Sequence, residues 1–396
     1  MAVIRALHLS DSHFSDRLRL PDIIEMHRVI LERARELRVN LILHAGDFFH
    51  ARSTPVERIA LAEWLQAAAE IAPVFGVRGN HDVAGDLAVF NRLRTKHPVI
   101  IEERVTTTAH MLTLEGGDRV GLLGMAWIDK AAMVSGMEAI DDQGTTTNAV
   151  VDGMRQLLTC LRAEASRVRT EGAVPILTTH VMIGGSVMSS GQVLIGQGVE
   201  LSPSDLADVG AAYVACGHVH CTQEFAGGRV VYSGSPVRHN LGEPEAKGFR
   251  FVQIGSAGGG VESEFVELPA RRIVLLDSPL RLSPELLIDS AFQSGEIPGA
   301  LVRLRYRVTP EELAAVDEDR LREALMGMGA HEVKLEAIVE QETRVRSEQI
   351  TAARDTWSKI EAWLVVKGIE IDAPTRERLR TKLAAIEAGQ AHEVPA

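Results

Sequence analysis

Cysteine is scarce in this sequence. The 396 residues include only Cys160, Cys216 and Cys221, and no two of them form a CxxC pair. An odd number of widely spaced cysteines argues against a disulfide framework and against a structural zinc site. We therefore expect a protein of a reducing compartment, the cytoplasm, in which the three thiols are small buried side chains.

Long apolar runs and a targeting segment are also missing. No stretch reaches the ~18 apolar residues of a membrane span, and Met1–Ser10 lacks the basic start and cleavage site of a signal peptide. Aromatic residues make up only 4% of the chain. The net charge of −12 argues against a protein that coats nucleic acid, but a nuclease stays possible because bound metal ions and a few local arginines supply a positive field.

What is present is the pattern of an α/β protein. Apolar stretches at residues 2–10, 41–43 and 74–77 read as strands, and helical spacing separates them after Pro21 and over residues 55–70. This rhythm predicts strands that helices bury on both faces. Because 396 residues exceed what one core usually organises, we expect one large domain with smaller appendages.

The pattern changes near Pro269 and again near residue 342. Between these points Arg303, Arg305 and Arg307 alternate with apolar residues, which predicts a half-buried strand whose basic face either contacts a duplex or is simply exposed. Beyond residue 342 an apolar stripe follows one face of a charged helix, at Ile350, Ala353, Trp357, Ile360 and Leu364. The stripe either packs on its own domain or docks on a partner coiled coil, and we favour docking.

Chemically active residues stand at the ends of five predicted strands. In chain order they are Asp11-Ser12-His13, Gly46-Asp47-Phe48-Phe49-His50, Gly79-Asn80-His81-Asp82, Thr179-His180 and Gly217-His218-Val219-His220. Open α/β sheets bind their ligands at the carboxyl ends of strands. One such segment alone recurs by chance, but five in this order predict a single site.

The residue types favour a catalytic metal centre. Asp11 and Asp47 offer carboxylates, which can bridge two cations, and the histidines offer nitrogen. A mixed oxygen and nitrogen set suits first-row divalent ions better than calcium or structural zinc. Two carboxylates leave a pair of divalent ions with net positive charge, so the centre attracts a phosphate ester and stabilises its transition state.

Taken together, the five segments resemble the signature of the calcineurin-like metallophosphoesterases. The resemblance implies that one metal ion is held by Asp11, His13, Asp47 and His220. It implies that the other is held by Asp47, Asn80, His180 and His218. His81 would be the general acid that protonates the leaving alkoxide, and Asp82 would orient its own loop.

Within that family the chain resembles the SbcD-type DNA double-strand-break-repair nucleases. His50 stands where phosphatase members usually carry aspartate, and it matches the histidine that helps position the phosphate in archaeal and eukaryotic counterparts of SbcD. Tyr232–Pro236 and Lys247–Phe249 also resemble SbcD segments. The chain departs from the bacterial SbcD pattern at His50, which is aspartate there, and at Cys221 and Thr222, where basic or proline residues are usual.

The SbcD resemblance implies a fold and an activity. We expect a four-layer α/β/β/α phosphoesterase domain at 1–270, a small α+β capping domain at 271–342 that helps orient DNA, and C-terminal helices at 343–396 that bind an SbcC-type, SMC-like ATPase. The implied activities are 3′–5′ exonuclease on duplex ends and endonuclease on single strands or hairpins, with Mn²⁺ as the metal. A homodimer associated with the cytoplasmic nucleoid, without membrane contact, is also implied.

Other interpretations stay open. Arg17, Arg19 and Arg52 follow metal motifs, where they either contact a DNA backbone or are solvated loop charges. His239, after the Ser-Gly-Ser-Pro turn, is a weaker candidate to line the cleft. The same metal site would serve a phosphodiesterase for cyclic nucleotides or other small molecules, which would cleave a bis-ester dye and not duplex DNA. A non-catalytic DNA-end scaffold would bind DNA without turnover.

Overall fold

The computed structural model describes residues 3–129, 143–189, 192, 198–255, 260–278, 282–340, 353 and 355–387. The chain divides into two compact units. The first comprises Met1–Pro279, Ser283–Arg305 and Glu318–Glu336, and the second Leu280–Leu282, Tyr306–Asp317 and Ala337–Ala396. The boundaries predicted at residues 270 and 342 stay predictions. No helix among the described residues is long and apolar enough to cross a membrane.

The first large sheet has six strands in the order β14-β13-β1-β2-β3-β4. Strands β1 to β4 run parallel, and β13 joins β1 antiparallel. The bounds are β1 Val3–Leu9, β2 Leu41–His44, β3 Val74–Val77, β4 Val99–Glu102, β13 Gly248–Gly255 and β14 Val261–Glu267. The helices that follow β1 and β2 are α1 (Leu20–Glu36) and α2 (Pro55–Ala69). Thr54 and Glu57 cap α2 reciprocally, so its first turn is well defined.

The second large sheet also has six strands, in the order β11-β12-β10-β7-β6-β5. Their bounds are β5 His110–Thr113, β6 Arg119–Met125, β7 Val174–His180, β10 Tyr213–Gly217, β11 Gln223–Phe225 and β12 Val230–Tyr232. The associated helices are α4 (Gln143–Thr170) and α5 (Pro203–Ala207). Shorter elements are η1 Asp16–Leu18, η2 Ala88–Arg92, η3 Ala226–Gly228, β8 Met182–Ile183 and β9 Glu200–Leu201.

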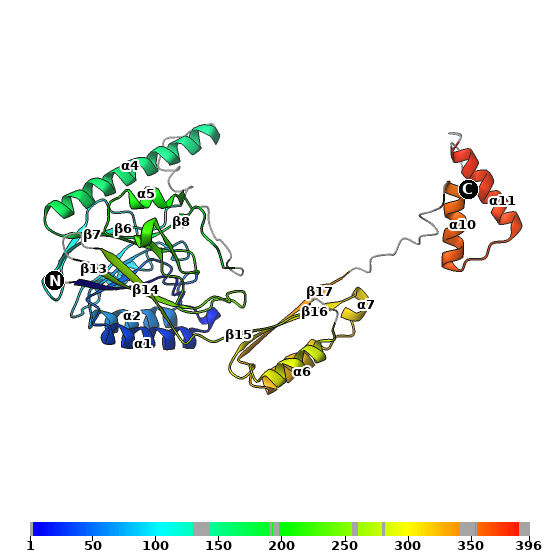
Figure 1. Ribbon diagram of the computed structural model, residues 1–396, viewed down its shortest axis with the longest axis horizontal. Helices are drawn as coiled ribbons and strands as arrows, with labels where there is room; N and C mark the ends of the chain where they lie inside the picture. The colour runs from blue at the N-terminus through cyan, green and yellow to red at the C-terminus, as the bar shows by residue number, and fades with distance from the viewer. Residues whose placement is uncertain are drawn as a thin grey trace. The chain divides into compact units, whose positions relative to one another are not determined.

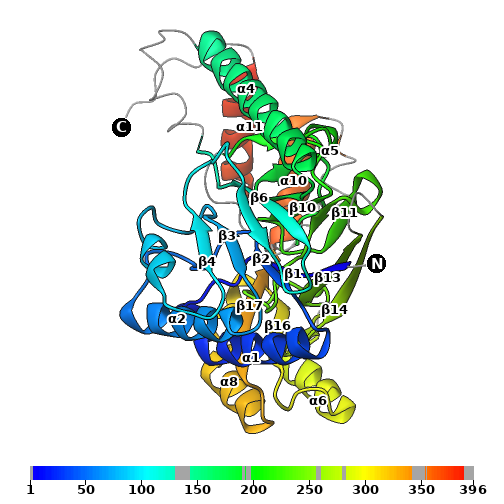
Figure 2. The same cartoon turned by 90° about the vertical axis from the view of Figure 1, so that its left-hand side faces the viewer.

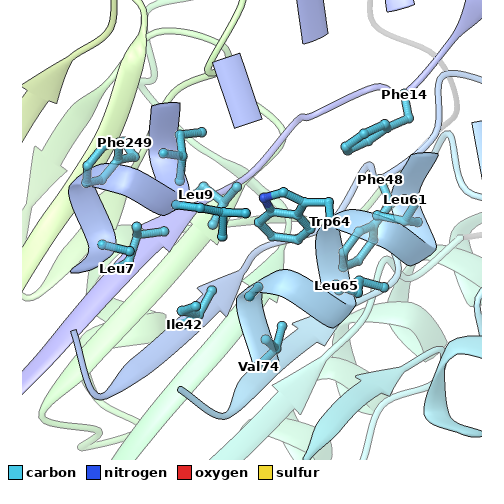
Figure 3. Packing of buried hydrophobic residues seen from close by; sticks show 14 of the residues in the cluster. Leu7, Leu9, Phe14, Ile42, Phe48, Leu61, Trp64, Leu65, Val74 and Phe249 are labelled. Carbon is cyan, nitrogen blue, oxygen red and sulfur yellow. The ribbon is translucent and has the colours of Figure 1, made fainter. Parts of the chain in front are cut away.

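Alternating side chains of β1 divide the core into layers. Leu7 and Leu9 pack with α1 and α2, whereas Ile4 and Ala6 face the second sheet. Figures 1 and 2 show α1 and α2 on one side of the paired sheets and α4 and α5 on the other. Trp64 of α2 lies in the outer layer among residues of the first sheet (Figure 3). The four-layer α/β/β/α architecture is confirmed.

A third sheet, of three strands in the order β15-β16-β17, follows the two large sheets in the chain. Its elements are β15 Ile273–Leu276, β16 Leu301–Val308, β17 Glu332–Val339, α6 Pro284–Ser294, α7 Pro310–Leu313 and α8 Glu318–Gly327. Strand β16 alternates as predicted, but its arginines are paired: Arg303 and Arg305 contact Glu336, and Arg307 contacts Glu340. The basic face is therefore largely neutralised by acidic side chains of β17 and the residue after it.

The chain ends in two described helices, α10 (Thr356–Lys367) and α11 (Ala373–Glu387). In the predicted stripe Leu364 is buried, Trp357 and Ile360 are half-buried, and the Arg380 guanidinium lies 6.0 Å from the Trp357 ring centroid. The stripe is therefore partly covered within this unit; its first residue, Ile350, lies outside the described residues. The expectation for the cysteines is wrong for Cys160, which is exposed, whereas Cys216 is buried and Cys221 half-buried.

Candidate metal centre

Four of the candidate ligands lie on unusual backbone. The φ angles are +54° at Asp11, +47° at His13, +55° at Asp47 and +110° at His218, in a region that L-residues rarely adopt. These residues closely follow β1, β2 and β10, where the chain turns away from its strand. Such conformations cost of order 1–3 kcal/mol each and persist only where surrounding structure holds them.

Glycines beside the ligands permit close approach. An ideal Cβ on Gly79 would lie 2.0 Å from Asp47 Oδ1, and one on Gly217 would lie 2.0 Å from the Ala45 carbonyl oxygen. A Cβ on Gly46 would lie 2.4 Å from Nδ1 of His180. The glycines of the Gly-Asp, Gly-Asn-His-Asp and Gly-His-Val-His segments therefore leave room for the ligands of neighbouring strands.

Two carboxylates form the buried acidic centre of the site. Asp11 is fully buried; its carboxylate accepts hydrogen bonds from the Ser10 hydroxyl at 2.5 Å and from the His218 backbone N–H at 3.2 Å. Asp47 accepts a hydrogen bond from the His81 backbone N–H at 2.9 Å. Burying two acids side by side is costly without compensating positive charge.

Asn80, His180 and His218 converge beside Asp47. The Asn80 side-chain oxygen Oδ1 lies 2.9 Å from His180 Nε2 and 2.9 Å from His218 Nδ1. His180 Nε2 is 3.4 Å from Asp47 Oδ2. The other ring nitrogen of His180 donates to the Ala45 carbonyl at 2.7 Å, which fixes the ring and directs Nε2 to this group.

His13 and His220 are a second pair of histidines beside the two aspartates, with ring centroids 5.3 Å apart. His13 Nε2 is 3.7 Å from Asp47 Oδ2, and His220 Nε2 is 4.0 Å from Asp11 Oδ1. His13 Nε2 is buried and has no hydrogen-bond partner among the described residues. A buried nitrogen lone pair aimed at carboxylate oxygens suits a divalent cation, so the residues fit the two-metal group.

The electrostatics of the centre call for positive charge. Burial by itself lowers the pKa of His180, but the carboxylates of Asp47 and Asp11 outweigh it and raise this pKa to about 9. Burial raises the pKa of Asp47, yet His180 and His81 hold it below its ordinary value. Without metal, a protonated histidine thus takes the role of the cation between the carboxylates.

The two proposed catalytic histidines lie together at the open side of the centre. His81 donates from Nδ1 to the His50 carbonyl at 2.7 Å, which leaves Nε2 unengaged by that bond. The two rings stack with centroids 5.0 Å apart, and His50 Nδ1 is 3.3 Å from His13 Nδ1. Burial and then the neighbouring His81 lower the pKa of His50, which favours its neutral form.

Asp82 supports the loop that carries Asn80 and His81. Its carboxylate accepts hydrogen bonds from the backbone N–H groups of Phe49 at 2.8 Å, Phe48 at 3.2 Å and Gly79 at 2.9 Å. It therefore ties the Gly-Asn-His-Asp loop to the Gly-Asp loop, as expected for a residue that orients its surroundings.

A cleft of about 270 Å³ opens over the centre. Its lining includes His13, Asp47, Asn80, His218 and His220, together with His50, His81, His239 and Gln192. Arg17 and Arg52 are exposed, whereas Arg19 pairs with Glu332 at 2.6 Å and donates to the Arg238 carbonyl. Of the three arginines, the two exposed ones are the better candidates for a ligand's phosphates.

Sequence reasoning missed several neighbours of the ligands. Glu243 is fully buried and lies 2.9 Å from His220 Nδ1, while buried Lys247 contacts the same carboxylate. The indole of Trp127 lies beside the ring of His218, with centroids 4.9 Å apart. His239, a weaker candidate from the sequence, is buried and donates from Nε2 to the Asp11 carbonyl at 2.8 Å. Of the missed residues, the sequence indicated only Lys247, as part of the segment Lys247–Phe249 that resembles SbcD.

Comparison with known proteins identifies the class. The family model "Calcineurin-like phosphoesterase" matches residues 4–222, more than half of the chain. The chain belongs to this family, which uses a dimetal centre, and the fold and the buried ligand set agree with it. It is a metal-dependent phosphoesterase.

The chain is also similar to individual members of this class. The chain is 28% identical over 316 residues to the D subunit of the SbcCD nuclease from Rhodobacter capsulatus, covering 72% of this chain and 74% of that one. It is 25% identical over 342 residues to the protein of the same name from Bacillus subtilis, covering 82% and 84%. It is also similar to "DNA double-strand break repair protein Mre11" of Archaeoglobus fulgidus, at 26% identity over 255 residues, covering 61% and 51%.

Proposed function

We propose that this chain is the nuclease component of a DNA double-strand-break-repair complex. The observation that carries the proposal is the extent of the similarity: it runs over 316 and 342 residues in two SbcD relatives, beyond the catalytic segment 4–222. The proposed activities are 3′–5′ exonuclease on duplex ends and endonuclease on hairpins and single strands. Because the proposed substrate is DNA, the proposed place of action is the cytoplasmic nucleoid.

The proposed chemistry is hydrolysis of a phosphodiester at the histidine-lined cleft. Asp11, His13, Asp47 and His220 would hold one metal ion, and Asp47, Asn80, His180 and His218 the other. Such ions, when bound, lower the pKa of water and stabilise charge on the phosphate. Manganese is the proposed metal, because the mixed oxygen and nitrogen set suits it.

Two histidines of this chain would act on the substrate itself. His81, with Nδ1 bonded to the His50 carbonyl, is oriented to deliver the Nε2 proton to the leaving oxygen. His50, stacked on His81, would donate a hydrogen bond that positions the phosphate.

Arg17 and Arg52 would contact the DNA backbone. Replacing either should make the affinity for DNA less dependent on salt concentration, and an unchanged salt dependence contradicts the contact.

The decisive test of the function is digestion of an end-labelled hairpin duplex in Mn²⁺. We expect wild-type cleavage to disappear in chelator, and to fall at least ~100-fold in His81→Asn, because a general acid contributes about that factor or more. Metal binding by His81→Asn should stay unchanged, measured by calorimetry.

His331→Asn is the matched control, since His331 is exposed and lies outside the centre; it should cleave like wild type. Cleavage of a bis-ester dye without cleavage of DNA would establish the small-molecule phosphodiesterase instead. DNA binding without any turnover by metal-loaded protein would establish the scaffold.

Partners and assembly complete the proposal. The capping region at 271–342 would help orient DNA, and the C-terminal region at 343–396 would bind an SbcC-type ATPase. On α10 and after it, Trp363, Val365, Val366 and Ile369 are exposed apolar residues available for such a contact. We also propose a homodimer that bridges two DNA ends; sedimentation at monomer mass with and without DNA contradicts it.

A further inference from the structure

We propose that Glu243 is a positioning residue of the metal centre, which holds His220 with its proton on Nδ1 and its Nε2 lone pair free for the metal. The inference rests on the proposed function only in that His220 is taken as a metal ligand. Glu243 is outside the five motifs and lies 23 positions after His220 in the chain.

The hydrogen-bond pattern assigns the tautomer of His220. Its Nδ1 lies 2.9 Å from Glu243 Oε1, and an ionised carboxylate can only accept, so Nδ1 carries the proton. The opposite nitrogen, Nε2, faces Asp11 Oδ1 at 4.0 Å. A histidine that donates to a carboxylate through one nitrogen and binds metal through the other is oriented and made more basic.

Glu243 is saturated with donors and is therefore not a metal ligand itself. Oε1 also accepts from the Asn240 side-chain amide at 2.9 Å. Oε2 accepts from the His239 backbone N–H at 3.0 Å and contacts Lys247 Nζ at 2.8 Å. The side chain is fully buried, so these four donors replace water entirely.

Lys247 keeps the carboxylate charged in this buried place. Its side chain is fully buried and contacts Glu243, Glu245 at 2.6 Å and the Ser235 hydroxyl at 2.9 Å. Burial would otherwise push this acid towards its neutral form. Because Glu245 also pairs with Lys247, the lysine is not left without an acid when Glu243 is removed.

The loop that carries Glu243 also contacts Asp11, another proposed ligand of the same metal ion. His239, whose backbone N–H is held by Glu243, donates from its Nε2 to the Asp11 carbonyl at 2.8 Å. Asp11 has the left-handed backbone conformation that needs external support. Glu243 is thus connected to two ligands of the same metal, His220 directly and Asp11 through His239.

The test is Mn²⁺ binding to the full chain, measured by calorimetry and by electron paramagnetic resonance, for Glu243→Ala and Glu245→Gln. We expect Glu243→Ala to weaken one of the two Mn²⁺ sites about 10–100-fold and to leave the His180 and His218 site intact. Glu245→Gln, which changes the other acid on Lys247, should bind both ions like wild type. Equal binding by both variants would overturn the proposal.

Two further measurements separate positioning from a general loss of structure. In Glu243→Ala/Lys247→Met the buried lysine charge is gone; if Mn²⁺ binding returns to wild type, the effect came from the lysine, which had lost one of its two acids, and the proposal fails. Nitrogen-15 spectra of labelled histidine in metal-free protein should show Nδ1–H for His220 in wild type and a tautomer mixture in Glu243→Ala. An unchanged tautomer also overturns it.

Failure of the nuclease proposal has a different signature. Wild-type protein that binds two Mn²⁺ and cleaves no DNA contradicts the proposed function, yet the difference between Glu243→Ala and Glu245→Gln remains measurable. Conversely, active wild type with Mn²⁺ binding unaffected by Glu243→Ala contradicts only the role of Glu243.

Discussion

Individual residues of the centre combine two costs, unusual backbone and buried charge. Asp11 and Asp47 both have positive φ and both carry carboxylates away from water. Cations offset the charge, and hydrogen bonds from neighbouring strands hold the backbone. Four of the seven described non-glycine residues with positive φ are candidate ligands, whose side chains must point to one place.

Gly79 gives a prediction at this scale. Its missing Cβ would lie 2.0 Å from Asp47 Oδ1, so Gly79→Ala must displace either the loop or the carboxylate. We expect it to lower the free energy of unfolding by roughly 1–3 kcal/mol and to weaken Mn²⁺ binding, measured by denaturant titration and calorimetry.

The matched control is Gly327→Ala in α8, where an added Cβ meets nothing within 4 Å. Alanine there should stabilise by up to ~1 kcal/mol and leave metal binding unchanged. If Gly79→Ala binds Mn²⁺ as tightly as this control does, the close approach is not needed for the site.

At the scale of elements, the C-terminal helices expose less of the predicted stripe than its spacing suggested. Leu364 is buried and Trp357 and Ile360 are half-buried, so docking of the stripe on a partner stays a prediction. The exposed apolar residues of α10 lie at other positions, among them Val365, which is 73% exposed. A three-four spacing finds the apolar face of a helix, but not whether a second helix of the same chain covers it.

If α10 forms part of the proposed ATPase interface, Val365→Glu should weaken binding of that ATPase at least ~10-fold, because a charge would be buried in the contact. Nuclease activity of the isolated chain should not change. Lys359→Glu, exposed on the same helix, is the control. Pull-down and calorimetry with the cognate ATPase measure the effect, and equal affinities for the two variants would remove α10 from the proposed interface.

At the scale of the whole molecule, buried histidines make folding sensitive to acid. Burial lowers the pKa of His27 to about 4 and that of His8 to about 3. In the unfolded chain both would bind a proton near pH 6.5. Above pH 6.5 both histidines are neutral in the folded and in the unfolded chain, so their burial adds no pH dependence. As the pH falls from 6.5 towards 4, the unfolded chain binds protons that the folded chain does not, and the free energy of unfolding decreases.

His27→Gln isolates one of these contributions. Glutamine can still donate to the Ile23 carbonyl and accept from the Ser12 hydroxyl, which are the partners of His27. Between pH 6.5 and 4.5, we expect wild-type stability to fall more steeply than that of the variant, by up to ~1.4 kcal/mol per pH unit. Denaturant titrations in chelator measure both slopes, and parallel slopes would contradict the buried neutral state of His27.

Much of this molecule could be predicted from its sequence. The candidate ligands could be recognised because their side chains are metal-binding types, namely Asp11, Asp47, Asn80 and the motif histidines. They stand at the ends of apolar runs that read as buried strands. Because parallel strands bring their carboxyl ends together, strand assignment groups the three segments after β1, β2 and β3 and, separately, the two after β7 and β10. Packing of the two sheets against each other then joins the two groups. The layers follow from the same pattern, since alternating faces of β1 must both be covered.

Other features were decided only by the tertiary structure. Glu243 and Lys247 are ordinary charged residues of a loop until burial beside His220 makes them part of the centre. Arg19 follows a metal motif just as Arg17 does, yet contact with Glu332 engages it. The role of such residues depends on neighbours that are distant in the chain and on the exclusion of water, and the local sequence pattern records neither. Motif residues can be recognised from sequence because their function lies in the chemistry of their own side chains.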